Sequence, residues 1–203
     1  MKRIQALQIL AAATADLPVV VTCAATSREL AAVADRPNHL YLLDAMGLAG
    51  SVATGIALGL ERPGAGNGPV GKVVAIEGDG SLLMNPNVLP TGGFLTPGNL
   101  LMVLLDNQVY GSTAGIPTYA TRIDLGRLAE ASGWSVLRAT GPEELRESFG
   151  RALTLTGPVF LHVRIEPGNA PDVPKLLEDP VVIARRFQDW LHDRTEEAAV
   201  TAP

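Results

Sequence analysis

Residues 72–81 read KVVAIEGDGS, an apolar run that ends in a glycine-rich acidic turn. The run 72–76 predicts a strand, because most of its residues are β-branched or apolar. Gly78-Asp79-Gly80 follows directly, so the turn lies at the carboxyl end of the predicted strand. Open α/β sheets bind their ligands at this edge. The stretch therefore predicts a sheet strand that leads into a binding site.

The same kind of apolar run recurs along the chain and alternates with helical patterns. The predicted strands are residues 18–22, 40–43, 72–76, 99–105, 134–137 and 159–165. The predicted helices are residues 3–15, 26–35, 47–60, 124–132, 142–156 and 180–193. Thr26 or Ser27, and Asp124, are suitable N-caps. Alternation of this kind is typical of a doubly wound α/β fold, so we expect a mainly parallel six-stranded sheet with helices on both faces.

One domain accounts for most of the 203 residues. We expect it to span residues 1–193 and to be followed by a disordered tail, residues 194–203, which lack apolar periodicity. The glycine- and proline-rich segment 64–71 predicts a flexible surface connection.

The composition argues against several classes of protein. No apolar run approaches the length that crosses a bilayer, and the 16 Lys and Arg residues are scattered, so we expect neither a membrane nor a nucleic-acid partner. Residues 1–15 superficially resemble a secretory signal, but Gln5 and Gln8 interrupt the apolar stretch, and an amphipathic helix explains it better. The single Cys23 cannot form an internal disulfide, so we expect a cytoplasmic protein with a small buried thiol.

The three histidines do not have the spacing of metal ligands. His39 begins a predicted strand, and we expect it to be solvated. We expect His162 to be structural or interfacial.

A second polar turn follows the next predicted strand. Residues 105–111 read LDNQVYG, which places Asn107 at the same edge of the sheet as Asp79. Magnesium takes oxygen ligands in octahedral geometry and is usually held by one or two protein groups together with phosphates. The two turns together predict a site for a metal ion and a diphosphate.

The arrangement of Gly78-Asp79-Gly80, 26 further residues and then Asn107 resembles the thiamine diphosphate motif of the decarboxylase superfamily. The resemblance implies that thiamine diphosphate and Mg²⁺ are the cofactors. It makes Asp79, Asn107 and the backbone carbonyl of Val109 the metal ligands. The residues that it places at the cofactor are Asp44, Met46, Gly78, Gly80, Ser81, Asn107 and Gly111.

Two of these residues come from the upstream segment Asp44-Ala45-Met46-Gly47-Leu48. It is similar to the family segment in which a bulky apolar residue bends the cofactor into a V shape, and Met46 is the match. The carbonyl of Asp44 would then accept a hydrogen bond from the aminopyrimidine. Taken alone, the segment is equally compatible with an ordinary helix start and a buried methionine.

Further motifs resemble the phosphonopyruvate and sulfopyruvate decarboxylases. They are residues 22–30 (TCAATSREL), 112–115 (STAG), 117–118 (PT) and 123–125 (IDL). The chain departs from this family at Cys23-Ala24-Ala25, where a glycine is usual, and at Ala114-Gly115-Ile116. Pro86 and Pro90 also fall in a segment that is usually a regular helix. These departures leave the substrate open.

The resemblance covers only the diphosphate-binding half of such enzymes. The other half supplies a glutamate to the aminopyrimidine ring, and Glu29, Glu61 and Glu77 offer no counterpart. We therefore expect no catalytic residue in this chain and a separate pyrimidine-binding subunit that carries this glutamate. The assembly would be a hetero-oligomer with at least two copies of each chain.

The implied activity is decarboxylation of a small 2-oxoacid by a lyase. Carboligation, a 2-oxoacid oxidoreductase subunit and a non-catalytic phosphate- or nucleotide-binding module remain open as alternatives. Ser112 and Thr113 are possible contacts to the substrate, although helix capping explains their hydroxyls too. Arg28 and Arg122 are candidates for binding an anionic substrate group, and surface ion pairs are the ordinary alternative.

Overall fold

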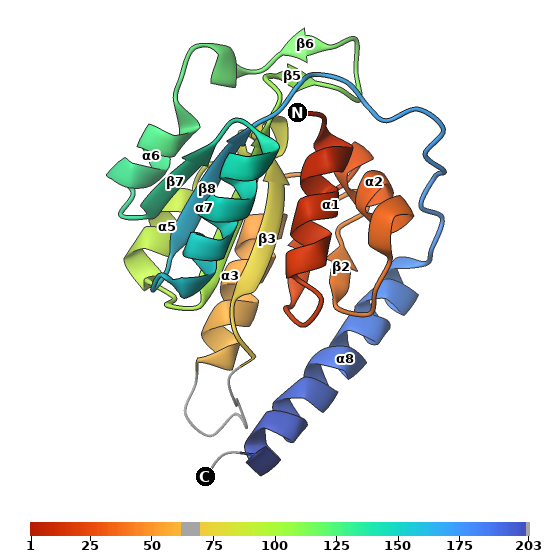
Figure 1. The fold of residues 1–203 in the computed structure, drawn as a ribbon, viewed down its shortest axis with the longest axis vertical. Coiled ribbons are helices and arrows are strands. Elements are labelled where there is room, and N and C mark those ends of the chain that lie inside the picture. The colour runs from red at the N-terminus through yellow and green to blue at the C-terminus, as the bar shows by residue number, and fades with distance from the viewer. Residues whose placement is uncertain (62–69, 202–203) are drawn as a thin grey trace.

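The structure, a computed structural model, describes residues 1–61 and 70–201, with side chains up to residue 197. Its centre is one parallel sheet of six strands in the order β2-β1-β3-β4-β8-β7 (Figure 1). The strands are β1 (Val19–Val21), β2 (His39–Tyr41), β3 (Val73–Gly78), β4 (Leu100–Asp106), β7 (Ser135–Ala139) and β8 (Val159–Arg164). This confirms the predicted fold class, with each strand shifted by at most a few residues.

Both faces of the sheet are buried, and the central strands show why. Along β3, Val74 and Ile76 point into one core, whereas Val73 and Ala75 point into the other. A strand covered on both sides needs apolar residues on both faces, which β3 has over Val73–Ile76 and β4 over Leu100–Leu105.

Two layers of helices cover these faces. The first core packs against α1 (Arg3–Ala13), α2 (Ala25–Ala34) and α7 (Pro142–Thr154). The second packs against α3 (Ala49–Leu60), α5 (Val88–Leu95) and α6 (Leu125–Ala131) (Figure 1).

The strand order reverses between β1 and β3. The chain passes from β1 outward to β2 on one side, and then returns to β3 on the other side of β1. At such a switch point the loops that leave the two strands diverge and open a crevice at the carboxyl edge of the sheet. The topology therefore places a binding crevice beside the Gly78-Asp79-Gly80 turn.

Some local details differ from the sequence predictions. Helix α2 begins at Ala25, so Thr26 and Ser27 lie inside it and are not N-caps, whereas the Asp124 side chain caps α6 by accepting a hydrogen bond from Arg127 N at 3.0 Å. After the acidic turn the chain forms two short helices, α4 (Asp79–Leu82) and α5, with Pro86 between them. A proline cannot donate the helical hydrogen bond, which explains the interruption.

The hairpin of β5 (Val109–Tyr110) and β6 (Ile116–Pro117) was not predicted.

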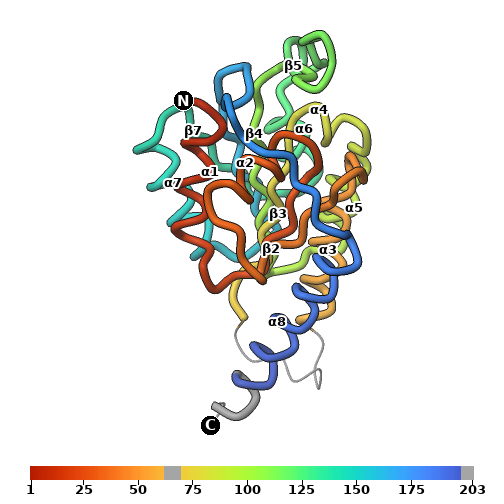
Figure 2. The backbone as a smooth tube through the Cα atoms, turned by 90° about the vertical axis from the view of Figure 1, so that its right-hand side faces the viewer, coloured from red at the N-terminus to blue at the C-terminus, as the bar shows by residue number. Residues whose placement is uncertain are grey.

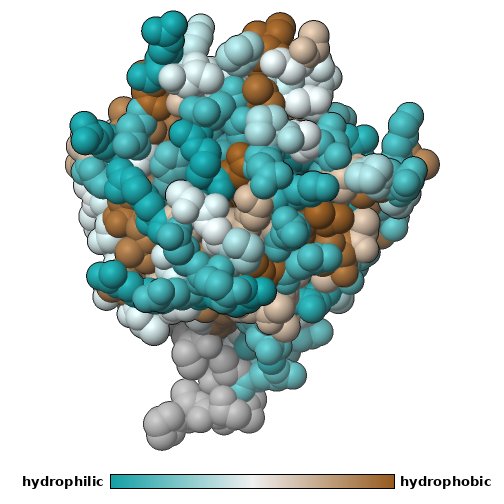
Figure 3. Space-filling view, turned by 45° about the horizontal axis from the view of Figure 1, so that its top comes forward, coloured by the Kyte–Doolittle hydropathy of each residue, from teal (hydrophilic) through white to brown (hydrophobic). Residues whose placement is uncertain are grey.

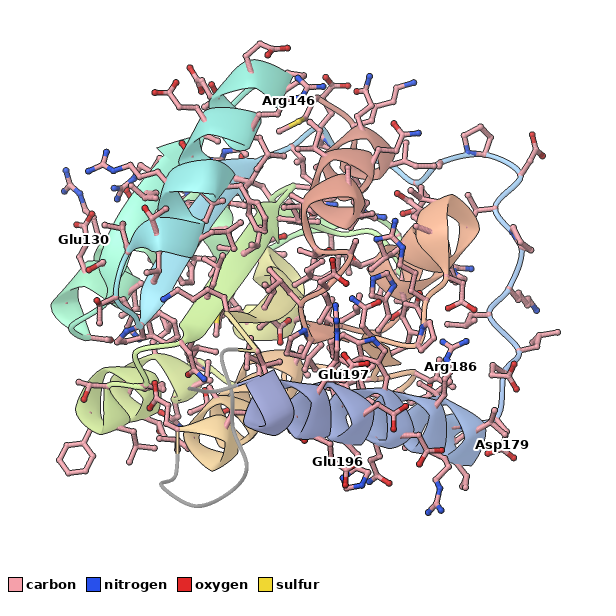
Figure 4. All side chains as sticks on the ribbon, turned by 60° about the horizontal axis from the view of Figure 1, so that its bottom comes forward. Glu130, Arg146, Asp179, Arg186, Glu196 and Glu197 are labelled. Carbon is pink, nitrogen blue, oxygen red and sulfur yellow. The ribbon has the colours of Figure 1, made fainter. Side chains whose placement is uncertain are left out.

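The C-terminal segment is a long helix, α8 (Pro180–Thr201), that packs against β2 (Figure 2). The structure thus differs from the predicted disordered tail, because residues 194–201 continue this helix. Arg186 projects from the side of α8 that faces the domain (Figure 4). It donates to both carboxylate oxygens of Asp35 at 2.8 and 2.9 Å, and Arg194 pairs with Asp16. These ion pairs add to the burial of Ile183 and Phe187, the apolar side chains with which the helix packs against the domain.

Of the predicted flexible connection at residues 64–71, residues 64–69 lie outside the described residues. Among the helices that are described, none is both long and apolar enough to cross a membrane.

His39 is fully buried on β2, so the prediction that it is solvated was wrong. Its Nδ1 lies 3.1 Å from the Tyr41 hydroxyl, and its Nε2 has no hydrogen-bond partner among the described residues. Burial lowers the pKa of His39 to about 4, and the positive charge of Arg36 adds to this effect. The folded protein therefore holds His39 in its neutral form.

We expect the free energy of unfolding to fall as the pH drops from about 6.5 to about 4. The pKa of His39 is lower in the folded state, so the unfolded chain takes up the proton first. His39 alone would then remove at most roughly 3 kcal/mol of stability across this window. Urea unfolding over a pH series measures the slope. His39→Gln should reduce it, whereas His192→Gln, at an exposed position, should leave it unchanged. Equal slopes for wild type and His39→Gln would contradict the assignment.

Candidate functional site

A cavity of about 530 Å³ opens at the carboxyl edge of the sheet, where the loops after β1, β2, β3 and β4 meet. This is the crevice expected at the switch point. Every residue that the sequence placed at the cofactor or the metal lines it: Asp44, Met46, Gly78, Asp79, Gly80, Ser81, Asn107, Val109 and Gly111. Residues up to 67 positions apart in the sequence are thus brought around one space.

Asp79 is a buried carboxylate without a cationic partner. Its side chain is 2% exposed, and none of the ion pairs among the described residues involves it. Burial raises the pKa of Asp79, and the charge of Asp106 adds to the rise, although a hydrogen bond from the Thr118 hydroxyl opposes it. A buried carboxylate of this kind is stabilised in its charged form by a nearby cation.

The second turn is joined directly to the first. Asn107 donates its backbone N–H to Asp79 Oδ1 at 3.3 Å, and its own side-chain Oδ1 accepts the N–H of Val109 at 3.0 Å. Gln108, between them, has a positive φ of 63° and donates Nε2 to the Ala120 carbonyl at 2.8 Å. The turn is therefore held in one conformation, and Asn107 and Val109, with their oxygen atoms, line the same cavity as Asp79.

These oxygens suit a hard cation that shares its shell with a ligand. Within residues 1–61 and 70–197, no group of three His, Cys, Asp or Glu side chains is placed to hold a metal ion. Magnesium does not need such a group, because it keeps phosphate oxygens and water among its ligands. One carboxylate, one amide oxygen and one backbone carbonyl fit that pattern.

At two positions in the cavity wall, nothing among the described residues requires a glycine. A Cβ on Gly78 would meet no atom within 4 Å, and its φ of −102° is open to any residue. A Cβ on Gly111 would meet only Asn169 Oδ1, at 3.5 Å. Close approach of a ligand to the backbone explains both. Gly80 differs, because a Cβ there would lie 2.6 Å from the Tyr110 ring.

A buried polar scaffold lies beneath the turn, and the sequence did not predict it. The Ser81 hydroxyl lies 2.6 Å from the Thr22 hydroxyl and accepts the N–H of Gly47 at 2.8 Å. Ser81 thereby joins the loops that follow β1 and β2 to the acidic turn, a structural role in addition to the predicted one.

Glu77 extends this scaffold to α3. Its Oε1 accepts the N–H of Gly50 at 3.2 Å in the first turn of that helix, and burial raises the pKa of Glu77. The sequence gives only a weak signal for the hydroxyls of Thr22 and Thr118. Thr22 is a polar residue at the end of a predicted strand, and Thr118 belongs to no predicted strand or helix.

The segment that carries Met46 is partly exposed. Met46 is 39% exposed, Leu48 43% and Met84 62%. The carbonyl of Asp44 accepts the N–H of Met46 at 3.1 Å, which leaves one lone pair for another donor. The reading of Met46 as an ordinary buried methionine is not supported. Viewed with the carboxyl edge turned forward, the surface carries hydrophobic patches separated by hydrophilic atoms (Figure 3).

The remaining candidates separate into two groups. Ser112 and Thr113 line the cavity, and Thr113 donates its hydroxyl to the Tyr110 carbonyl at 2.9 Å. Arg122 lines a neighbouring cavity of about 410 Å³ with His162, and Arg28 lines neither. The structure therefore does not bring the two predicted anion-binding arginines to the cavity.

The loop after β1 contains the departure noted in the sequence. Ala24 has a positive φ of 63°, a conformation that glycine adopts more easily. Cys23 beside it lines the cavity and is only half buried, so the prediction of a buried thiol was wrong. Burial still raises the pKa of Cys23, and the charge of Glu77 adds to the rise.

Comparison with known proteins adds independent findings. The family model described as thiamine pyrophosphate enzyme, C-terminal TPP binding domain, matches residues 20–163. The chain is 41% identical over 197 residues to the sulfopyruvate decarboxylase subunit beta of Methanothermobacter thermautotrophicus, covering 97% of this chain and 99% of that protein. It is 38% identical over 191 residues to the phosphonopyruvate decarboxylase of Streptomyces viridochromogenes, covering 93% of this chain and 46% of that enzyme.

Solved structures agree on the fold. Benzoylformate decarboxylase from Polynucleobacter necessarius superposes with a TM-score of 0.67 at 22% identity, covering 82% of this chain and 33% of its own. The 2-oxoglutarate:ferredoxin oxidoreductase from Magnetococcus marinus superposes with a TM-score of 0.61 at 18% identity. The match covers 94% of this chain and 66% of the oxidoreductase chain. At these identities the likeness concerns the fold alone.

Substituting Gly78 by Ala should separate folding from binding. Because the new Cβ meets no atom of the described residues, we expect the free energy of unfolding of the apo variant to lie within about 1 kcal/mol of the wild-type value. The methyl group projects toward the cavity, so the affinity for thiamine diphosphate with Mg²⁺ should fall roughly tenfold or more. Thermal unfolding and calorimetric titration measure the two effects. The matched control is Gly150→Ala, which is equally free of clashes but lies on α7. Unchanged affinity in Gly78→Ala would contradict a ligand at this wall.

Proposed function

Because this chain belongs to the thiamine pyrophosphate enzymes, within the group of sulfopyruvate and phosphonopyruvate decarboxylases, we propose that it is the cofactor-binding subunit of a two-subunit 2-oxoacid decarboxylase. The observation that carries the proposal is the pair of turns at one sheet edge, where Asn107 N–H meets the Asp79 carboxylate. Both turns face a cavity large enough for a small-molecule cofactor.

The proposed metal site consists of Asp79, the side-chain oxygen of Asn107 and the carbonyl of Val109. These three groups would hold Mg²⁺, and the diphosphate of the cofactor would complete the shell. The backbone at Gly78, Gly80, Ser81 and Gly111 would lie against the diphosphate. The unpaired charge of buried Asp79 and the open space at Gly78 support these roles.

When bound, thiamine diphosphate supplies the electron sink for loss of carbon dioxide from a 2-oxoacid. This chain's own residues would fix its position. Met46 would support the bend between the two rings, and the free lone pair of the Asp44 carbonyl would accept a hydrogen bond from the aminopyrimidine. The half-exposed Met46 side chain at the cavity supports this assignment.

The activating glutamate would come from a partner chain. No glutamate is among the described residues that line the cavity. Glu29 pairs with Arg3, Glu77 binds the N–H of Gly50, and Glu61 accepts the N–H of Asn99 at 3.0 Å, so each has a structural partner.

The relatives support the same division. The archaeal relative is named as a beta subunit and is matched over 99% of its length, whereas this chain spans 46% of the Streptomyces enzyme. We propose a hetero-oligomer with at least two copies of each chain in the cytoplasm, acting on a sulfopyruvate- or phosphonopyruvate-like substrate. Partly exposed Met46, Leu48 and Met84 would be covered by the partner.

Replacing Asp79 by Asn should remove Mg²⁺-dependent cofactor binding. Asn fits the same space without a buried charge, so we expect the apo protein to remain folded while the affinity for thiamine diphosphate with Mg²⁺ falls about 100-fold. Calorimetric titration with and without Mg²⁺ measures this loss. Asp189→Asn, at an exposed position on α8, is the control. Wild-type affinity in Asp79→Asn would show that the turn has been misassigned.

Reconstitution tests the two-subunit proposal. The purified chain with thiamine diphosphate and Mg²⁺ should release little carbon dioxide from sulfopyruvate or phosphonopyruvate. Addition of a pyrimidine-binding partner chain should increase the rate by several orders of magnitude, because only then is the cofactor activated. A coupled assay for carbon dioxide measures the rate. Full activity of the isolated chain would rule out a divided active site.

A further inference from the structure

Arg3 is a buried arginine in the wall of the cavity. Its side chain is 7% exposed, although it lies near the start of the first helix. Nη1 donates to Glu29 Oε1 at 2.9 Å and to Asn169 Oδ1 at 3.1 Å, and Nη2 donates to the Gly168 carbonyl at 3.3 Å. Three segments, α1, α2 and the chain after β8, therefore fix one guanidinium.

These contacts do not use the whole guanidinium. Arginine has five N–H donors, and three are used here, so the Nε–H and one Nη2–H have no partner among the described residues. Arg3 Nε is not among the buried unpartnered atoms of the described residues, so this donor is accessible to solvent at the cavity. Since the side chain faces the cavity, an acceptor in the cavity would satisfy them.

The surroundings of Arg3 indicate what kind of acceptor fits. Among the described residues that line the cavity, Arg3 carries the sole cationic side chain, whereas Asp44 and Asp79 carry carboxylates. Asn169 Oδ1, which binds Arg3, also lies 3.5 Å from the Cβ position of Gly111. Arg3 thus lies close to the wall where a ligand approaches the backbone.

The N-terminus of α2 opens on the same part of the cavity. Ala24, Ala25 and Thr26 line the cavity there, and no side chain caps the helix. Unpaired N–H groups in the first turn of a helix attract anions. Glu29, one turn further along α2, holds Arg3 beside this helix end. A fixed guanidinium and a free helix end next to each other favour an oxyanion.

We infer that Arg3 binds a tetrahedral oxyanion in the cavity, held in place for this purpose by Glu29 and Asn169. The inference rests on the proposed function, which supplies two such groups, the terminal phosphate of the cofactor and the phosphonate or sulfonate of the substrate. Arg3 therefore takes the role that the sequence suggested for Arg28 and Arg122, neither of which lines the cavity.

The test must separate the guanidinium from its ion pair. Arg3→Gln alone would leave Glu29 buried and unpaired, which can unfold the protein. We therefore compare Glu29→Gln, which keeps Arg3, with the double variant Arg3→Gln/Glu29→Gln, which lacks it without leaving a buried charge. Arg3→Lys gives a second comparison with wild type, since it keeps both charges and loses the planar fork. Thermal unfolding establishes that each variant is folded.

Two probes distinguish the sources of the oxyanion. Calorimetry with pyrophosphate and Mg²⁺ reports on the cofactor's phosphate, and calorimetry with sulfoacetate, on the chain loaded with cofactor and partner, reports on the substrate's acid group. We expect the double variant to bind one probe at least tenfold more weakly than Glu29→Gln, and Arg3→Lys to show a smaller loss relative to wild type. The probe that is affected identifies the ligand.

Equal affinities of Glu29→Gln and the double variant for both probes would overturn the inference and leave the ion pair as a purely structural contact. In that case wild type would still bind thiamine diphosphate, so the proposed function would stand. If wild type itself does not bind pyrophosphate with Mg²⁺, even with the partner present, both the proposed function and the role of Arg3 fail.

Discussion

The hydrogen bond from the backbone N–H of Asn107 to the carboxylate of Asp79 joins the two turns on which the cavity depends. It forms because β3 and β4 are paired with Gly78 opposite Leu105. Both strands therefore end at the same level of the sheet, and the turns that follow them meet. A shift of one residue would turn the alternating side chains of either strand into the wrong core. The packing of both faces of the sheet therefore determines the geometry of the site.

This arrangement carries a cost that the rest of the molecule offsets. Glu77 and Asp79 are buried carboxyl groups two positions apart, and burial raises the pKa of each. Hydrogen bonds from Thr118 to Asp79 and from Gly50 to Glu77 oppose this rise in pKa. The apolar strands and the two helical layers supply the stability that tolerates such groups. A site that would favour a cation is thus part of the apo fold.

The strands and their ends could be predicted from sequence because apolar runs and glycine turns are local signals. The same signals located Asp79 and Asn107 correctly at one edge. Arg3 was missed, because its partners Glu29 and Asn169 lie 26 and 166 positions away and no local pattern marks them. The continuation of α8 over residues 194–201 was missed for the same reason, since Arg194 pairs with Asp16, 178 positions away. Tertiary ion pairs, unlike periodicity, leave no trace in a short window of sequence.

Helix α8 also has a consequence for how the chain behaves before assembly. β2 is an outer strand of the sheet, and an outer strand presents unpaired backbone groups that can recruit a strand from another molecule. β2 is only three residues long. Helix α8 packs against it and is held there by the ion pair of Arg186 with Asp35, so the strand is shielded. The sheet is therefore protected on this side against edge-to-edge aggregation.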